Sequence, residues 1–293
     1  MNLPVIKINE SDRAGMKSLL QKLQKQSFNF NSCNIDLSLF KTIRNEINNT
    51  HFPYLLEASE VLRLSNKGYL IIDFGKDFDF YSNLKATLAI VLCSIVYPFG
   101  IFEKFGLWKE IGVDLTKEPN RSSGVGYNPF HIDFVNTTNP PFYSILFCIR
   151  QDPNGGGQTI VSNFLKVIEE LSKEELVRLE KSIYSEGSFF GLQNVGIEYN
   201  PFPILQINSV SETILRFTSK INSEQNLDIS LVNKIEKLLI KNQDTFLLEK
   251  NQLVIFNQRI VCHGRLALNG QQSLVNQNDR RLLLQTFGRN YAD

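Results

Sequence analysis

Apolar and polar residues alternate with a helical period in the first part of this chain and form shorter, strand-like runs after it. Segments 12–26 and 37–49 carry apolar residues three or four positions apart, so residues 1–60 are predicted to be largely helical. Residues 84–97 are apolar around nearly the whole helix circumference, which is typical of a helix buried against a sheet. We expect this helix to end at the proline and glycine within 98–100.

Short apolar runs bounded by turn residues predict the strands of the remainder. The runs are 68–74, 142–150, 158–163, 204–207, 213–218, 253–257 and 281–287. Residues 108–128 are rich in glycine, proline and serine and are expected to form a loop. Three further helices are expected, over 162–171, from the capping box at 172–175, and over 230–241.

The order of these elements predicts an α+β fold in one domain over residues 1–293. Helices come first, and strands with inserted helices follow, which favours a helical layer against a β-sandwich or barrel. We see no internal repeat, low-complexity tract or linker that would divide the chain. The helices within 164–200 interrupt the strand pattern and are interpreted as an insertion or a lid. A doubly wound parallel sheet is not expected, because strands and helices do not alternate regularly.

Composition and charge exclude several classes of protein. Of the 293 residues, 42% are hydrophobic and 21% are charged, which is usual for a globular chain and excludes disorder as the main state. Lys and Arg number 31 against 30 Asp and Glu, so no charge excess indicates nucleic acid or a membrane surface as a partner. The cysteines form no CxxC motif, and the first residues lack a secretory signal. We therefore expect a cytoplasmic protein with reduced thiols, and the sequence leaves its oligomeric state open.

Two of the three histidines lie in motifs that suit a metal ion. His131 and Asp133 are two positions apart, so in an extended segment both side chains would point to the same face. His263 follows 132 residues after His131, directly after an apparent strand. Two histidines and one carboxylate form the facial triad of non-heme Fe(II) oxygenases, which leaves metal positions open for a 2-oxo acid and O2. An HxD motif alone does not establish such a site, since a buried histidine with satisfied hydrogen bonds is the ordinary alternative.

Four sequence blocks in order strengthen this interpretation. They are NPFHIDF around His131, the turn GGGQT that begins 24 residues after His131, NQRIVCHGR around His263, and RRLLLQTF near the end. Over residues 120–290, the chain resembles the taurine dioxygenase family, which includes clavaminate synthase-like enzymes. The resemblance implies a double-stranded β-helix (jelly-roll) core with helical additions. It also implies that Fe(II) is the metal and that 2-oxoglutarate and O2 are cosubstrates.

The resemblance assigns roles to individual residues. His131, Asp133 and His263 match the metal ligands of the family and form the expected catalytic centre. Thr159 matches the threonine that helps to hold 2-oxoglutarate. An arginine after the second histidine is expected to bind the distal carboxylate of 2-oxoglutarate, because its planar guanidinium can donate two parallel hydrogen bonds to a carboxylate.

Two consecutive arginines compete for this role. In a strand, Arg280 and Arg281 point to opposite faces, so only one of them can face the site. We favour Arg281, because Gln285 stands four residues after it, where family members often carry a polar or basic side chain; Arg280 is the alternative. Arg265 and Asn136 are candidates for contacts with the substrate, and for Arg265 a structural salt bridge is an equal alternative.

The predicted function is that of an Fe(II)- and 2-oxoglutarate-dependent dioxygenase that hydroxylates a free amino acid or an amino-acid-derived metabolite and releases succinate and CO2. An oxidative desaturase of an isonitrile-bearing amino-acid derivative is the alternative within the same class. Outside that class, the alternatives are a non-catalytic jelly-roll binding protein and a zinc hydrolase with the same three ligands. Asp133 favours oxygenation or desaturation over halogenation, because related halogenases carry a small residue in its place. The expected partner is a small-molecule substrate, with no nucleic acid and no membrane.

Overall fold

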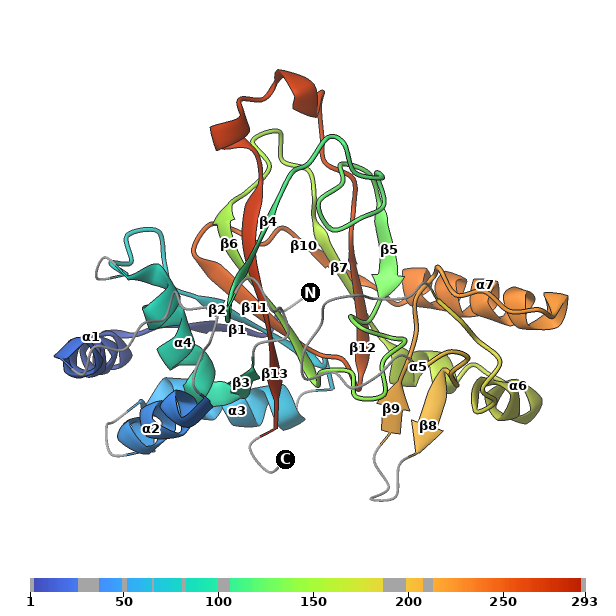
Figure 1. Cartoon of the computed structure of the whole chain (residues 1–293), viewed down its shortest axis with the longest axis horizontal. Helices are drawn as coiled ribbons and strands as arrows, with labels where there is room; N and C mark the ends of the chain where they lie inside the picture. Colours follow the sequence, from blue (N-terminus) through green and yellow to red (C-terminus); the bar gives the residue numbers. More distant parts are fainter. Residues whose placement is uncertain are drawn as a thin grey trace.

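Two sheets, flanked by helices on their outer sides, form the fold (Figure 1). A computed structural model describes residues 3–25, 37–48, 52–64, 66–80, 83–99, 106–186, 199–207 and 213–290. Within these ranges, no helix has both the length and the apolar character needed to cross a membrane. The mixed helix and strand content and the early position of the helices agree with the α+β prediction.

The larger sheet has seven strands in the order β1-β2-β11-β6-β13-β3, with β4 also paired to β13. Its strands are β1 (Val5–Lys7), β2 (Tyr69–Asp73), β3 (Tyr97–Phe99), β4 (Lys109–Gly112), β6 (Tyr143–Arg150), β11 (Gln252–Asn257) and β13 (Leu282–Arg289). Strand β4 lies in a segment expected to be a loop. Its four residues acquire strand geometry by pairing with β13 at the edge of the sheet, which a local pattern does not reveal.

The smaller sheet has four strands in the order β10-β7-β12-β5. They are β5 (Asn128–His131), β7 (Thr159–Asn163), β10 (Asp244–Phe246) and β12 (Val261–Arg265). A separate hairpin pairs β8 (Leu205–Ile207) with β9 (Thr213–Leu215). Apolar side chains from the two sheets form one buried cluster, so the sheets pack against each other through it.

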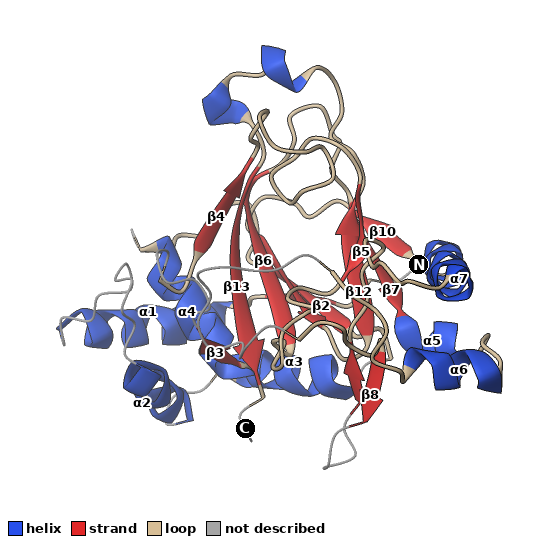
Figure 2. Ribbon diagram, turned by 45° about the vertical axis from the view of Figure 1, so that its right-hand side comes forward, coloured by secondary structure: helices blue, strands red, loops and turns tan. Residues whose placement is uncertain are grey.

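The helical layer predicted for the start of the chain packs against the larger sheet (Figures 1 and 2). It consists of α1 (Glu10–Lys25), α2 (Leu37–Asn48), α3 (Pro53–Leu64) and α4 (Leu84–Ile95). Helix α4 is buried along its length, as its apolar circumference predicted. Asn83 caps it by accepting a hydrogen bond from the Ala86 N–H at 3.1 Å. The helix ends at Ile95 rather than at 97, because the chain there enters strand β3.

Three helices lie beyond the smaller sheet, namely α5 (Phe164–Ile168), α6 (Lys173–Leu179) and α7 (Asn226–Lys241). The capping box of α6 forms as predicted, with both reciprocal hydrogen bonds between Ser172 and Glu175. Helix α5 is shorter than the expected 162–171, since Asn163 caps its start and the helix ends at Ile168. Of the segment 164–200 interpreted as an insertion or lid, residues 187–198 lie outside the described ranges. Two single-turn 3₁₀ helices, Gln272–Leu274 and Gln277–Asp279, precede β13.

Candidate active site

Strands β5 and β12 bring the three candidate metal ligands together. His131 is the last residue of β5 and lies directly opposite His263 in the antiparallel pair. Asp133 follows two residues later, where the chain turns at Phe134 with a φ of 60°. The Asp133 carboxylate oxygens lie 4.0 Å from His131 Nε2 and 3.5 Å from His263 Nε2. One ligand atom from each residue can be chosen within 4.8 Å of the others, so the three could hold one metal ion.

Hydrogen bonds orient two of these side chains toward the shared point. His131 Nδ1 lies 2.7 Å from the Pro129 carbonyl oxygen and donates to it, which leaves the Nε2 lone pair for a metal. The Ser144 hydroxyl donates to Asp133 Oδ2 at 2.5 Å. The Asp133 backbone N–H donates to Gln258 Oε1 at 2.6 Å, and the buried Gln258 is itself anchored. The side chains of His131 and Asp133 therefore each have a preset direction.

The His263 imidazole is held by packing. It stacks on the Phe256 ring with centroids 4.6 Å apart and an interplanar angle of 4°. Its Nδ1 has no hydrogen-bond partner among the described residues. Burial lowers the pKa of His263 to about 3, and the nearby His131 contributes in the same direction. The ring is therefore neutral at physiological pH, which is the form that binds a metal. Two imidazole nitrogens and a carboxylate oxygen fit iron(II).

A cavity between the two sheets adjoins the three candidate ligands. Its polar lining side chains are Ser122, Asn128, Thr159, Arg265, Arg281 and Gln285, and its apolar ones are Ile111, Leu146 and Leu283. Burial, and secondarily the Arg265 guanidinium, lowers the pKa of Arg281 to about 10, so Arg281 remains charged at neutral pH. Thr159 and Arg281, both expected from the sequence, thus share this cavity with the metal ligands.

The remaining candidates take different places. Arg280 does not line this cavity, and its Nε donates to the Val275 carbonyl at 3.1 Å. Arg265 does line it, but its guanidinium is tied to the backbone carbonyls of Gly124 at 2.8 Å and Leu266 at 2.9 Å. Asn136 is buried beside the site rather than in it, and its amide donates to the Glu186 carbonyl at 3.5 Å.

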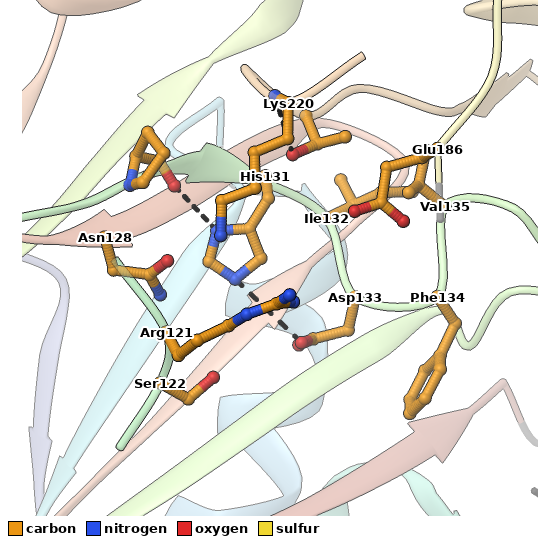
Figure 3. A pocket seen from close by; sticks show the side chains of 12 residues that line it. Arg121, Ser122, Asn128, His131, Ile132, Asp133, Phe134, Val135, Glu186 and Lys220 are labelled. Carbon is orange, nitrogen blue, oxygen red and sulfur yellow. Dashed lines mark hydrogen bonds and ion pairs between the residues drawn. The ribbon is translucent and has the colours of Figure 1, made fainter. Parts of the chain in front are cut away.

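A second cavity of about 130 Å³ lies on the outer side of His131 and Asp133 (Figure 3). Charged side chains from separate segments line it, namely Arg121, Glu186 and Lys220. In the view of Figure 3, Glu186 and Lys220 lie on one side of the two ligands and Arg121 on the other. His131 and Asp133 line both cavities and therefore lie between the inner cavity and this outer one.

Sequence reasoning missed the residues that orient the ligands and the charges of the outer cavity. Ser144 is a polar residue within the otherwise apolar run 142–150, and this was the only sign in the sequence that its hydroxyl has a specific partner. Gln258 stands inside the block that carries His263, but its contact with Asp133 depends on how the chain folds back. Glu186 and Lys220 lie far from every motif block, and no sequence signal pointed to them.

Comparisons with known proteins give one family match and several similar folds. A family model described as "Taurine catabolism dioxygenase TauD, TfdA family" matches residues 106–286. The structure of an asparagine oxygenase in complex with Fe(II), 2S,3S-3-hydroxyasparagine and succinate is similar at a TM-score of 0.78 and 18% identity, covering 98% of this chain and 93% of that chain. The non-heme iron oxygenase OrfP in complex with Fe and alpha-ketoglutaric acid has a TM-score of 0.69 and 12% identity, covering 98% and 94%.

A variant of OrfP in complex with (3S)-hydroxy-L-Arg is also similar, at a TM-score of 0.74 and 14% identity, and the alignment covers 98% of this chain and 94% of that chain. No curated protein matches this chain. At these sequence identities, the similarity to the solved structures shows a common fold and no more. The family match covers the segment that holds all three candidate ligands.

Proposed function

Because this chain belongs to the taurine catabolism dioxygenase TauD, TfdA family, we propose that it hydroxylates a free amino acid or an amino-acid-derived metabolite. The expected class, an oxygenase that uses iron(II), 2-oxoglutarate and O2, is that of this family and is confirmed by the family match. Succinate and CO2 are the coproducts. The observation that carries the proposal is the His131, Asp133 and His263 cluster, with ligand atoms within 4.8 Å, between two cavities.

The proposed architecture is a jelly-roll, a double-stranded β-helix whose two walls are the larger and the smaller sheet. The apolar cluster between the sheets and the position of the ligands on the smaller one support this arrangement. We treat 1–293 as one domain, since helices α1 to α4 share a single apolar cluster with the larger sheet. Segment 164–200 is proposed as the insertion or lid, and Glu186, which reaches the outer cavity, supports that role.

The inner cavity is the proposed site for 2-oxoglutarate. His131, Asp133 and His263 would hold iron(II), and the buried cation of Arg281 would bind the distal carboxylate of 2-oxoglutarate together with the Thr159 hydroxyl. Bound iron(II), 2-oxoglutarate and O2 would together supply the oxidant that removes hydrogen from an unactivated C–H bond. The Ser144 hydroxyl positions the Asp133 carboxylate, and three apolar side chains, Ile111, Leu146 and Leu283, line the inner cavity.

The proposed substrate class rests on the outer cavity and on the similar structures. The asparagine oxygenase and OrfP structures contain hydroxylated amino acids, and this chain matches both folds along nearly its whole length. The outer cavity carries charges of both signs, as a small polar substrate requires. A near-neutral net charge of +1 gives no support to a nucleic acid or membrane partner.

An anaerobic titration tests the proposal. Metal-free protein receives iron(II) and then 2-oxoglutarate, and visible absorption is followed. We expect a charge-transfer band that requires both additions, and no such band in His263→Ala. Succinate release with amino acids as substrates then tests turnover. Bound iron without a band in folded protein would contradict the cosubstrate assignment and favour the zinc hydrolase, whereas failure to bind iron would favour a non-catalytic binding protein.

A further inference from the structure

The carboxylate of Glu186 faces the outer cavity, where none of the described residues pairs with it. It accepts no hydrogen bond and forms no ion pair among the described residues, although the residue is only partly exposed. The backbone beneath it is fixed by Asn200, whose Oδ1 accepts from the Glu186 N–H at 3.3 Å and whose Nδ2 donates to the Glu186 carbonyl at 2.8 Å. Asn200 thus fixes the Glu186 backbone, while the part of the chain that the structure describes offers its carboxylate no partner.

Lys220 faces the same cavity from a segment attached to the metal site. Thr218 forms a β-bridge with the metal-ligand candidate His131, and the Ser219 N–H donates to the Phe130 carbonyl at 2.9 Å. The Lys220 backbone follows directly, and its N–H lies 3.3 Å from Thr218 Oγ1. The ammonium group donates to the Asn120 carbonyl at 2.9 Å, which uses one of its three N–H groups.

The Glu186 carboxylate and the Lys220 ammonium group carry opposite charges but are not in contact. No ion pair within 4.0 Å joins them, although each feels the field of the other. Burial raises the pKa of Glu186, and Lys220 and Arg121 oppose this; burial likewise lowers the pKa of Lys220, and Glu186 opposes this. A half-buried charge without a partner is costly, and such costs persist at binding sites, where a ligand supplies the missing partner.

We propose that Glu186 binds the ammonium group and Lys220 the carboxylate of a zwitterionic substrate, so that the enzyme acts on amino acids whose ammonium group is unmodified. This inference rests on the proposed function and deepens it. An isonitrile or an N-acylated derivative carries no positive charge on nitrogen and would leave the Glu186 carboxylate unpaired. The outer cavity thus favours hydroxylation of a free amino acid over desaturation of an isonitrile-bearing derivative.

Binding to the anaerobic protein loaded with iron(II) and 2-oxoglutarate tests this assignment. The twenty standard L-amino acids are titrated, with the N-acetyl and the carboxamide derivative of each one that binds, and the shift of the charge-transfer band gives the Kd. We expect at least one free amino acid to bind. Each derivative should bind at least about tenfold more weakly, since a charge-assisted contact is lost.

Two variants separate the two contacts. Glu186→Gln should weaken binding of the free amino acid at least about tenfold and reduce the penalty for N-acetylation to within about threefold. Lys220→Gln should do the same for the carboxamide. Glu224→Gln and Lys117→Gln, which change charges that do not line the outer cavity, should bind as the unchanged protein does.

The outcomes also separate this inference from the proposed function. A normal band with no binding of any free amino acid, or with an N-acetyl derivative that binds as tightly as its parent, would overturn the zwitterion site and leave the enzyme class standing. Equal losses in Glu186→Gln for free and N-acetylated ligands would also overturn it, since the effect would then be structural. Absence of the band itself would contradict the proposed function instead.

Discussion

At the scale of single residues, two consecutive arginines have different surroundings. Arg281 lines the inner cavity next to the candidate metal ligands. The Arg280 side chain instead donates a hydrogen bond to a backbone carbonyl. We predict that Arg281→Ala raises the concentration of 2-oxoglutarate needed for half-saturation about 10- to 100-fold, because a charge-assisted contact is lost. Arg280→Ala should change it by less than about threefold. Titration of the charge-transfer band measures both values, and the reverse ranking would assign the role to Arg280.

The residues that orient the ligands mark the limit of what the sequence predicts at this scale. The HxD motif and the CHGR block identify all three candidate ligands, because metal chemistry restricts which side chains can serve. Ser144 touches Asp133 from a strand of the other sheet. Such contacts depend on how two sheets pack, and a hydroxyl in a strand has many possible partners. Sequence spacing therefore points to candidate ligands more directly than to the residues that orient them.

At the scale of secondary-structure elements, the close approach of β5 and β12 sets the distance between the two histidines. Gly264 lies between His263 and Arg265, and a Cβ there would come 2.7 Å from the Asn128 carbonyl oxygen. We predict that Gly264→Ala pushes β5 away from β12. It should lower the free energy of unfolding by about 1–3 kcal/mol and weaken iron(II) binding as well, because the ligands separate.

Gly112→Ala is the matched control, because a Cβ there would meet its nearest neighbour at 3.7 Å, an ordinary contact. Denaturant unfolding and anaerobic iron(II) titration measure the two effects. Unchanged iron affinity in a destabilised Gly264→Ala protein would show that the β5–β12 spacing does not control the metal site.

Helices and strands were predicted correctly where the local hydrophobic pattern is strong. They were missed where a segment becomes a strand only by pairing with a neighbouring strand. The long apolar helix α4 and the strands β2, β6, β11 and β13 follow from hydrophobic patterns and turn residues. Strands β1, β4 and β10 have three or four residues each, too few for a period to be visible. They are strands because the backbone of a neighbouring strand forms hydrogen bonds with them, as that of β2 does with β1. Their positions therefore depend on tertiary structure rather than on local sequence.

At the scale of the whole molecule, the larger sheet is covered by apolar side chains on both faces. One cluster joins it to helices α1 to α4, and another joins it to the smaller sheet. The sequence predicted the helical layer from the order of the elements, but not that β2 pairs with β11, which lies far away along the chain. The candidate metal ligands lie on the smaller sheet or directly after its strand β5, so the packing of the two sheets supports the site.

The packing of the two sheets buries His263. The effect of this burial on the stability of the folded protein depends on pH. The pKa of His263 is about 3 in the folded protein against an ordinary value of 6.5, so between these values the unfolded chain binds a proton that the folded chain does not. The stability from this group is complete above about pH 6.5 and is lost as pH falls toward 3. We predict that lowering pH from about 7.5 to 5.5 costs the metal-free protein about 1.4 kcal/mol more than it costs His263→Gln. Denaturant unfolding of both proteins at the two pH values measures this difference, and equal losses would mean that the imidazole binds its proton as readily in the folded protein as in the unfolded chain.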